Sequence, residues 1–146
     1  MASWIAIDPG ERRIGIARSD PLGMLAHPAE VAPSVPEVIA WIRRFQEERD
    51  VAGVVVGYPL NMDGSVGPIA RRSFTVVRTL REALDCPVGL WDERLSSQHV
   101  SRATGGAGGR DAPIDHHAAA VILQSYLDAG TPPLTDPPEM DEGAEP

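Results

Sequence analysis

The stretch Ser3-Trp4-Ile5-Ala6-Ile7-Asp8-Pro9-Gly10 decides the fold. Its first six residues are largely apolar and end in an acid, which is typical of a buried β-strand whose last side chain reaches the edge of a sheet. Pro9 and Gly10 then supply a turn, and the glycine lets another segment approach the backbone closely. We therefore expect Asp8 at the end of a buried strand.

Two further extended segments follow this strand. Ile14 and Ile16 alternate with smaller residues, and the sequence Asp-Pro-Leu-Gly at 20–23 forms a second turn. A third extended segment ends near Val31. Short turns between consecutive strands predict an antiparallel meander of three strands.

Helical and extended patterns alternate through the rest of the chain. The run at 51–57 is rich in valine and too short for a helix, so it predicts a strand covered on both faces in a parallel sheet. The other expected elements are helices at about 36–49, 68–84, 96–103 and 114–128, and a strand at 88–91. Together they predict an α/β fold: a mixed five-stranded sheet, with three antiparallel strands and then two parallel ones, and helices on both faces.

Acids stand at the carboxyl ends of the first and last predicted strands. Asp8 ends the first strand, and Asp92 and Glu93 end the last. Sites in open α/β sheets collect at such ends, although a turn-forming aspartate or a solvated Asp-Glu-Arg turn would also explain these residues. Because successive strand side chains point to opposite faces, we expect one acid of the pair to join Asp8. The longer side chain of Glu93 favours Glu93 as that acid. We expect Asp92 to lie beside the metal-binding residues without binding the metal itself.

Asp115 precedes a long apolar helix, where an acid can cap the helix or interact with its dipole. A helix that begins at the sheet edge also aims its first turn at the site, so Asp115 is the third predicted acid. Three carboxylates without a cysteine cluster favour Mg²⁺ or Mn²⁺ over zinc, and His116 and His117 have no matching ligands elsewhere. Two such ions can activate a water and hold a phosphate, so we predict Asp8, Glu93 and Asp115 as the catalytic and metal-binding residues of a nuclease.

The length and composition bound the class of protein. A chain of 146 residues can bury one core, so we expect one nuclease domain over residues 1–130. No stretch resembles a signal peptide or a membrane span, which predicts a cytoplasmic protein without a membrane partner. Cys86 is the single cysteine, so no disulfide within the chain supports the fold.

The net charge of −8 comes mostly from the C-terminal tail. Residues 131–146 hold five acids and no basic residue; without them, 13 arginines stand against 16 acids, a net charge of −3. The tail is also rich in proline, so we expect 131–146 to be a disordered acidic segment.

Four blocks of the sequence resemble the YqgF family, which comprises pre-16S rRNA nucleases and Holliday junction resolvase-like proteins. The blocks are Asp8-Pro9-Gly10-Glu11-Arg12-Arg13-Ile14-Gly15-Ile16-Ala17, Val55-Val56-Gly57-Tyr58-Pro59-Leu60-Asn61-Met62-Asp63-Gly64, Trp91-Asp92-Glu93-Arg94-Leu95-Ser96-Ser97, and the helix that begins at Ile114-Asp115. They occur in the family's order and cover most of residues 4–128. The resemblance implies an RNase H-like fold, and it carries the catalytic acids of the family onto Asp8, Glu93 and Asp115.

The resemblance further implies cleavage of RNA, at the 5' end of precursor 16S rRNA. One alternative is resolution of branched DNA, which needs two active sites and hence a homodimer, so that a monomer and a homodimer both remain open. Another is a binding module that works in transcription or ribosome assembly without cutting. The residues expected to contact the nucleic acid are Arg12, Arg13, Arg94, Arg71, Arg72 and Asn61.

Overall fold

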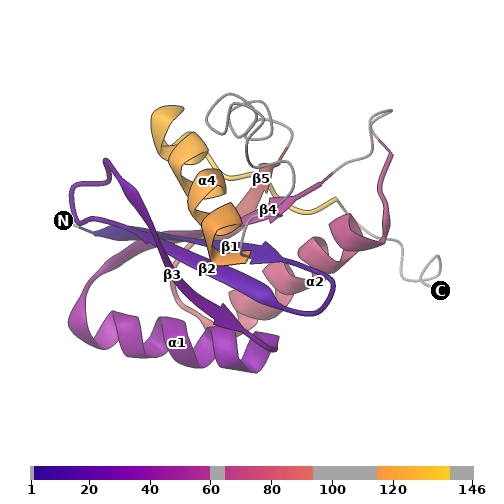
Figure 1. Cartoon of the computed structure of the whole chain (residues 1–146), viewed down its shortest axis with the longest axis horizontal. Helices are drawn as coiled ribbons and strands as arrows, with labels where there is room; N and C mark the ends of the chain where they lie inside the picture. The colour runs from indigo at the N-terminus through magenta and orange to yellow at the C-terminus, as the bar shows by residue number, and fades with distance from the viewer. Residues whose placement is uncertain (1, 60–64, 94–114, 139–146) are drawn as a thin grey trace.

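Five strands form one mixed sheet in the order β3-β2-β1-β4-β5 (Figure 1). The computed structural model describes residues 2–59, 65–93 and 115–138. Its elements are β1 (Ser3–Pro9), β2 (Ile14–Ser19), β3 (Ala26–Ala32), α1 (Val35–Glu48), β4 (Val51–Tyr58), α2 (Pro68–Ala83), β5 (Val88–Asp92) and α4 (Asp115–Asp128). The predicted fold class is confirmed, because β1, β2 and β3 pair antiparallel whereas β4 pairs parallel with both β1 and β5.

The turn between β1 and β2 needs a glycine. The N–H of Gly10 donates to the carbonyl oxygen of Arg13 over 2.8 Å. A Cβ at position 10 would lie 2.8 Å from that same oxygen, closer than real Cβ contacts come. The missing side chain therefore allows the tight turn that follows Asp8.

Alternation along the strands gives the sheet two unlike faces. One face carries large side chains such as Ile5, Ile7 and Ile16, which pack with α1 and α2. The opposite face carries Ala6 and Ala17, and α4 covers it. Figure 1 shows α1 and α2 on one side of the sheet and α4 on the other. Small residues under α4 let that helix approach the strands closely.

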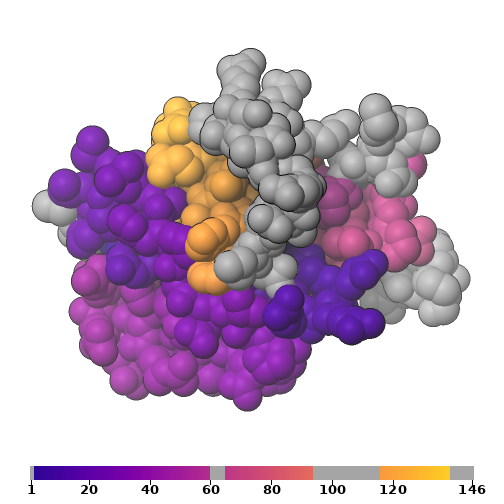
Figure 2. Space-filling model, viewed as in Figure 1, coloured from indigo at the N-terminus to yellow at the C-terminus, as the bar shows by residue number. Residues whose placement is uncertain are grey.

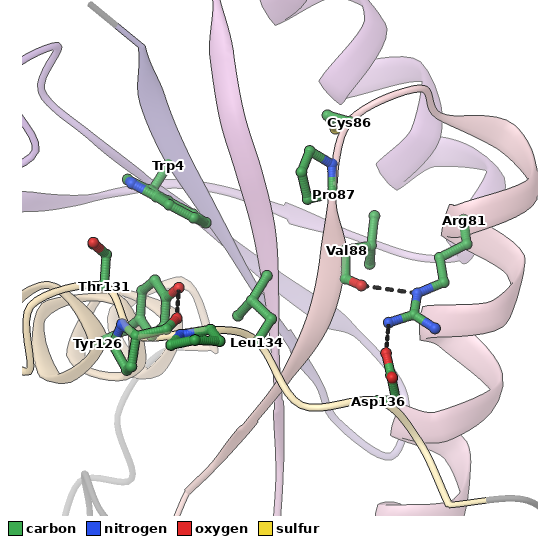
Figure 3. Close-up of a pocket in the computed structure, with 11 residues that line it drawn as sticks. Trp4, Arg81, Cys86, Pro87, Val88, Tyr126, Thr131, Leu134 and Asp136 are labelled. Atoms are coloured by element: carbon green, nitrogen blue, oxygen red, sulfur yellow. Dashed lines mark hydrogen bonds and ion pairs between the residues drawn. The ribbon is translucent and has the colours of Figure 1, made fainter.

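Residues 131–138, which we call the C-terminal strap, pack against the outer edge of β5. The N–H of Leu90 donates to the carbonyl oxygen of Thr135 over 2.8 Å, and the N–H of Thr135 returns a bond to Leu90 over 3.3 Å. Arg81 of α2 bonds to Asp136 over 2.7 Å and to the carbonyl oxygen of Val88 over 2.8 Å (Figure 3).

The strap differs from the disordered tail that the sequence led us to expect. Its order has a local cause: Gly130 takes a φ of 87° and Thr131 a φ of 47°, which turns the chain back at the end of α4. Leu134 then enters a notch at Gly89, where an added Cβ would overlap the Cβ of Leu134. The segment at 139–146, the predicted helix at 96–103 and the glycine-rich stretch at 105–109 lie outside the described residues.

In the part of the chain that the structure describes, every helix is too short or too polar to cross a bilayer.

Candidate active site

Asp8 lies near the carboxyl end of β1, on the face that α4 covers. Alternation sets this orientation, since Ala6 belongs to the α4 side of the core whereas Ile7 belongs to the other. Its neighbour on β2 is Gly15, which has no side chain to crowd the acid. Asp8 is half-buried as a residue.

Glu93 follows directly after β5, and the sheet holds its backbone. Its N–H donates to the carbonyl oxygen of Tyr58 over 2.9 Å, which extends the pairing of β4 and β5 by one residue. The side chain lies on the α4 face and reaches Asp8, to which its protonated carboxyl group donates a hydrogen bond. The structure thus brings Asp8 and Glu93 together, although 85 residues separate them in sequence.

The environment of Glu93 raises its pKa from 4.5 to about 8. Burial is the largest cause, because removal from water penalises the charged form. The charge of Asp8 and the hydrogen bond to it follow, and the charge of Asp92 adds a smaller contribution. Without a cation, the pair therefore holds a proton at neutral pH.

Asp92 is the last residue of β5 and is half-buried. By strand alternation its position belongs to the face opposite Glu93. Its charge nevertheless acts on Glu93.

Asp115 is the first residue of α4, and its side chain lies outside the described residues. Positions 115 and 122 are seven residues apart, nearly two helical turns, so they share one side of the helix. Ile122 on that side lies over Gly57 of β4, beside Glu93. α4 therefore passes close to Glu93 at Ile122.

The predicted arginines differ in their surroundings. Arg12 and Arg13 are exposed in the turn after Asp8, and in Figure 2 the indigo atoms of this turn protrude from the surface. Gly10, Glu11, Arg12 and Arg13 line a hollow of about 540 Å³. Arg71 is exposed on α2, whereas Arg72 donates to the carbonyl oxygen of Glu11 over 3.0 Å and so braces the turn. Arg94 and Asn61 lie outside the described residues.

Another cavity, of about 510 Å³, lies away from these acids (Figure 3). Trp4, Val88, Tyr126 and the strap line it. Trp4 and Val88 stand near the starts of β1 and β5, whereas Asp8 and Glu93 stand near their ends. The cavity is therefore at the opposite margin of the sheet.

The donor set suits a hard divalent cation. The carboxyl groups of Asp8 and Glu93 share a proton, and a cation bound by both carboxylates could take the place of that proton. Oxygen ligands of this kind match Mg²⁺ and Mn²⁺. Within the described residues, no three His, Cys, Asp or Glu side chains gather closely enough to hold a metal ion.

Comparison with known proteins agrees with the fold. The family described as RuvX, Holliday junction resolvase, matches residues 2–129. A protein of Syntrophomonas wolfei named "Putative pre-16S rRNA nuclease" is 41% identical over 133 residues, covering 87% of this chain and 94% of its own. A protein of Chloroflexus aurantiacus with the same name is 44% identical over 131 residues, covering 86% of both chains.

Among solved structures, T. thermophilus RuvC in complex with a Holliday junction substrate aligns with a TM-score of 0.53 at 19% identity. The alignment covers 90% of this chain and 98% of RuvC, and it supports the RNase H-like fold. Fold and relatives together define a nuclease that hydrolyses phosphodiester bonds in nucleic acid. The chain belongs to the RuvX family, the Holliday junction resolvase family whose model it matches.

Proposed function

We propose that this nuclease is a divalent-metal-dependent endonuclease in which Asp8, Glu93 and Asp115 hold Mg²⁺ or Mn²⁺. The observation that carries the proposal is the contact between the carboxyl groups of Asp8 and Glu93, with the pKa of Glu93 raised to about 8. Buried like charges are costly unless a proton or a cation lies between them. Such a pair is therefore suited to cation binding.

Each residue has a distinct part in this mechanism. Asp8, half-buried as a residue, offers a carboxylate from the end of β1. Glu93 would lose its proton to solvent when a cation binds and would then provide the second carboxylate. Bound ions of this kind activate water and neutralise charge on the scissile phosphate and the leaving oxygen. Arg12 and Arg13 stand beside Asp8, where they contact the phosphate backbone and orient the strand.

For the substrate we propose RNA, and in particular the 5' end of precursor 16S rRNA. The relatives at about 40% identity carry a name that specifies pre-16S rRNA. A protein that matures ribosomal RNA would work in the cytoplasm. The description of the matched family favours a second candidate, resolution of a four-way DNA junction, for which two copies must act together.

One cleavage assay separates these candidates. The two substrates are precursor rRNA and a four-way DNA junction, tested in parallel with Mn²⁺ or Mg²⁺. The proteins are the wild type, the site variants Asp8→Asn, Glu93→Gln and Asp115→Asn, and the variant Glu82→Gln. Glu82 is an exposed acid on α2 and serves as the control. We expect wild type and Glu82→Gln to cleave the RNA and the three site variants to be inactive. Equal activity in Asp8→Asn would refute the assigned site, and faster cleavage of the junction would select the second candidate.

The same proteins distinguish a nuclease from a module that only binds. Titration of Mn²⁺ by calorimetry should show binding to the wild type and a large loss in Asp8→Asn. A wild type that binds nucleic acid but neither binds Mn²⁺ nor cleaves would be a binding module.

A further inference from the structure

The two acids that meet at the site come from strands that are not neighbours. Asp8 is on β1 and Glu93 follows β5, while β4 lies between these strands. Adjacent strands are about 4.8 Å apart, so the backbones that carry the acids are separated by roughly twice that distance. The side chain of Glu93 must therefore cross β4 to reach Asp8.

Gly57 of β4 lies beneath this crossing. An added Cβ at position 57 would lie 3.1 Å from Oε2 of Glu93 and 3.2 Å from its Cγ. The side chain of Glu93 would therefore have to shift by a few tenths of an ångström to admit a Cβ at position 57, and by more for a larger residue. The pairing of Ile7 with Val56 places Gly57 level with Asp8, on the same face.

The backbone of Gly57 is fixed from the other side of the sheet. The buried hydroxyl of Ser73, on α2, donates to the carbonyl oxygen of Gly57 over 2.8 Å. One residue later, Tyr58 accepts the N–H of Glu93. These two hydrogen bonds, from Ser73 of α2 and from the backbone of Glu93, hold this part of β4 in place. A side chain at position 57 would therefore displace the side chain of Glu93 more readily than it would move β4.

We propose that Gly57 is a positioning residue of the active site, whose missing side chain lets Glu93 cross β4 and meet Asp8. The inference rests on the proposed metal-dependent function for its catalytic consequence. Gly57→Ala should separate the two carboxyl groups while leaving the sheet intact.

Ile122 provides the control for ordinary packing. The same added Cβ would lie 2.7 Å from Cδ1 of Ile122, so Gly57→Ala also crowds α4. Valine lacks that atom, and Gly57→Ala combined with Ile122→Val removes the crowding but leaves Glu93 obstructed. Ile122→Val alone completes the set.

The first measurement is Mn²⁺ affinity by calorimetry on the full chain, with kcat and KM for RNA cleavage beside it. Loss of a group that orients a ligand lowers metal affinity by about 10- to 100-fold, which we expect for Gly57→Ala. The double variant should regain thermal stability without regaining metal affinity, and Ile122→Val should bind Mn²⁺ as the wild type does. Wild-type affinity in Gly57→Ala, or in the double variant, would overturn the proposal, because Gly57 would then only make room for α4.

A second measurement needs no metal. A double-mutant cycle of Asp8→Asn and Glu93→Gln on unfolding reports the coupling between these side chains. We expect coupling when the cycle is built on the wild type and its loss when the cycle is built on Gly57→Ala; coupling of equal size in both would contradict the positioning role. If the cycles show this pattern but the wild type binds no Mn²⁺, the proposed function fails while the role of Gly57 stands.

Discussion

Glu93 and Asp8 come from the two strands that flank β4, and their carboxyl groups meet in a hydrogen bond across it. Nothing in the stability of a sheet requires two acids in contact on a largely buried face. The contact raises the pKa of Glu93 and makes the pair sensitive to protons and to cations.

Asp8→Asn should remove activity without harming the fold. Loss of a ligand that supports several kcal/mol of charge stabilisation corresponds to a fall in cleavage rate of about 100-fold or more. The amide can still accept the hydrogen bond from Glu93, and one buried charge is gone. We therefore expect the metal-free melting temperature to stay level or to rise, as measured by circular dichroism. A lower melting temperature would contradict the expected stability of Asp8→Asn, and full activity would contradict its expected loss of cleavage.

The stability of the metal-free protein should fall as the pH rises from about 4.5 to 8. Glu93 has its pKa raised from 4.5 to about 8 in the folded state, so between these values the folded chain binds a proton that the unfolded chain releases. The contribution is fully present below pH 4.5 and is lost as the pH passes 8. Urea denaturation in EDTA at several pH values measures it. Glu93→Gln should lack this component, and parallel profiles for the two proteins would argue against it.

Binding of Mn²⁺ should release a proton below pH 8. As a proposed metal ligand, Glu93 must bind in its carboxylate form, whereas its pKa of about 8 favours the protonated form in the free protein at neutral pH. Apparent affinity should therefore increase with pH and level off above 8. Calorimetry at pH 6.5 in two buffers of different ionisation enthalpy counts the protons. A buffer-independent heat would mean that Glu93 is not a ligand.

The C-terminal strap should contribute to stability. Truncation after Pro138 should have little effect, whereas truncation after Gly130 removes Leu134 from its notch and both bonds to Leu90. We expect the shorter protein to lose about 2 kcal/mol of unfolding free energy. Asp136→Asn should lower the unfolding free energy by less than about 1 kcal/mol, because its ion pair with Arg81 is exposed to solvent. The side chain of Arg81 is 38% exposed and that of Asp136 is 82% exposed. Equal denaturation midpoints for the two truncations would show that the strap is dispensable.

The turn after Asp8 should account for part of the salt dependence of RNA binding. Arg12→Ala and Arg13→Ala each remove a proposed phosphate contact, so the slope of log affinity against log salt should fall by about 0.7 to 0.9 per variant. Arg78 is the control, because it bonds to the carbonyl oxygen of Pro138 in the strap. An equal effect of Arg78→Ala would indicate a general charge effect. Filter binding at several salt concentrations gives the slopes.

Most of the fold follows from local sequence. The valine run at 51–57, the alternation around Ile14 and Ile16, and Pro68 at the start of α2 each predict their element to within about two residues of its observed bounds. The choice of Glu93 over Asp92 also follows, because alternation and side-chain length both favour it.

Long-range register was harder to predict. The crossing at Gly57 depends on β4 lying between β1 and β5, and a single sequence does not give that spacing. A glycine inside a valine-rich strand does indicate a close approach of some other group, and this indication was available. The strap was missed because proline and acid content predicts disorder, whereas the notch at Gly89 and the guanidinium of Arg81 are tertiary features.

The two faces of the sheet should tolerate different amino-acid substitutions. Beneath α1 and α2, large aliphatic side chains can exchange for one another at nearly constant volume, so many combinations will fold. Beneath α4, Ala6 and Ala17 have no room to grow, and a bulkier residue would act as a wedge under the helix. Because α4 begins at Asp115, which we propose as a metal ligand, such a wedge should also lower the cleavage rate although it lies far from the phosphate.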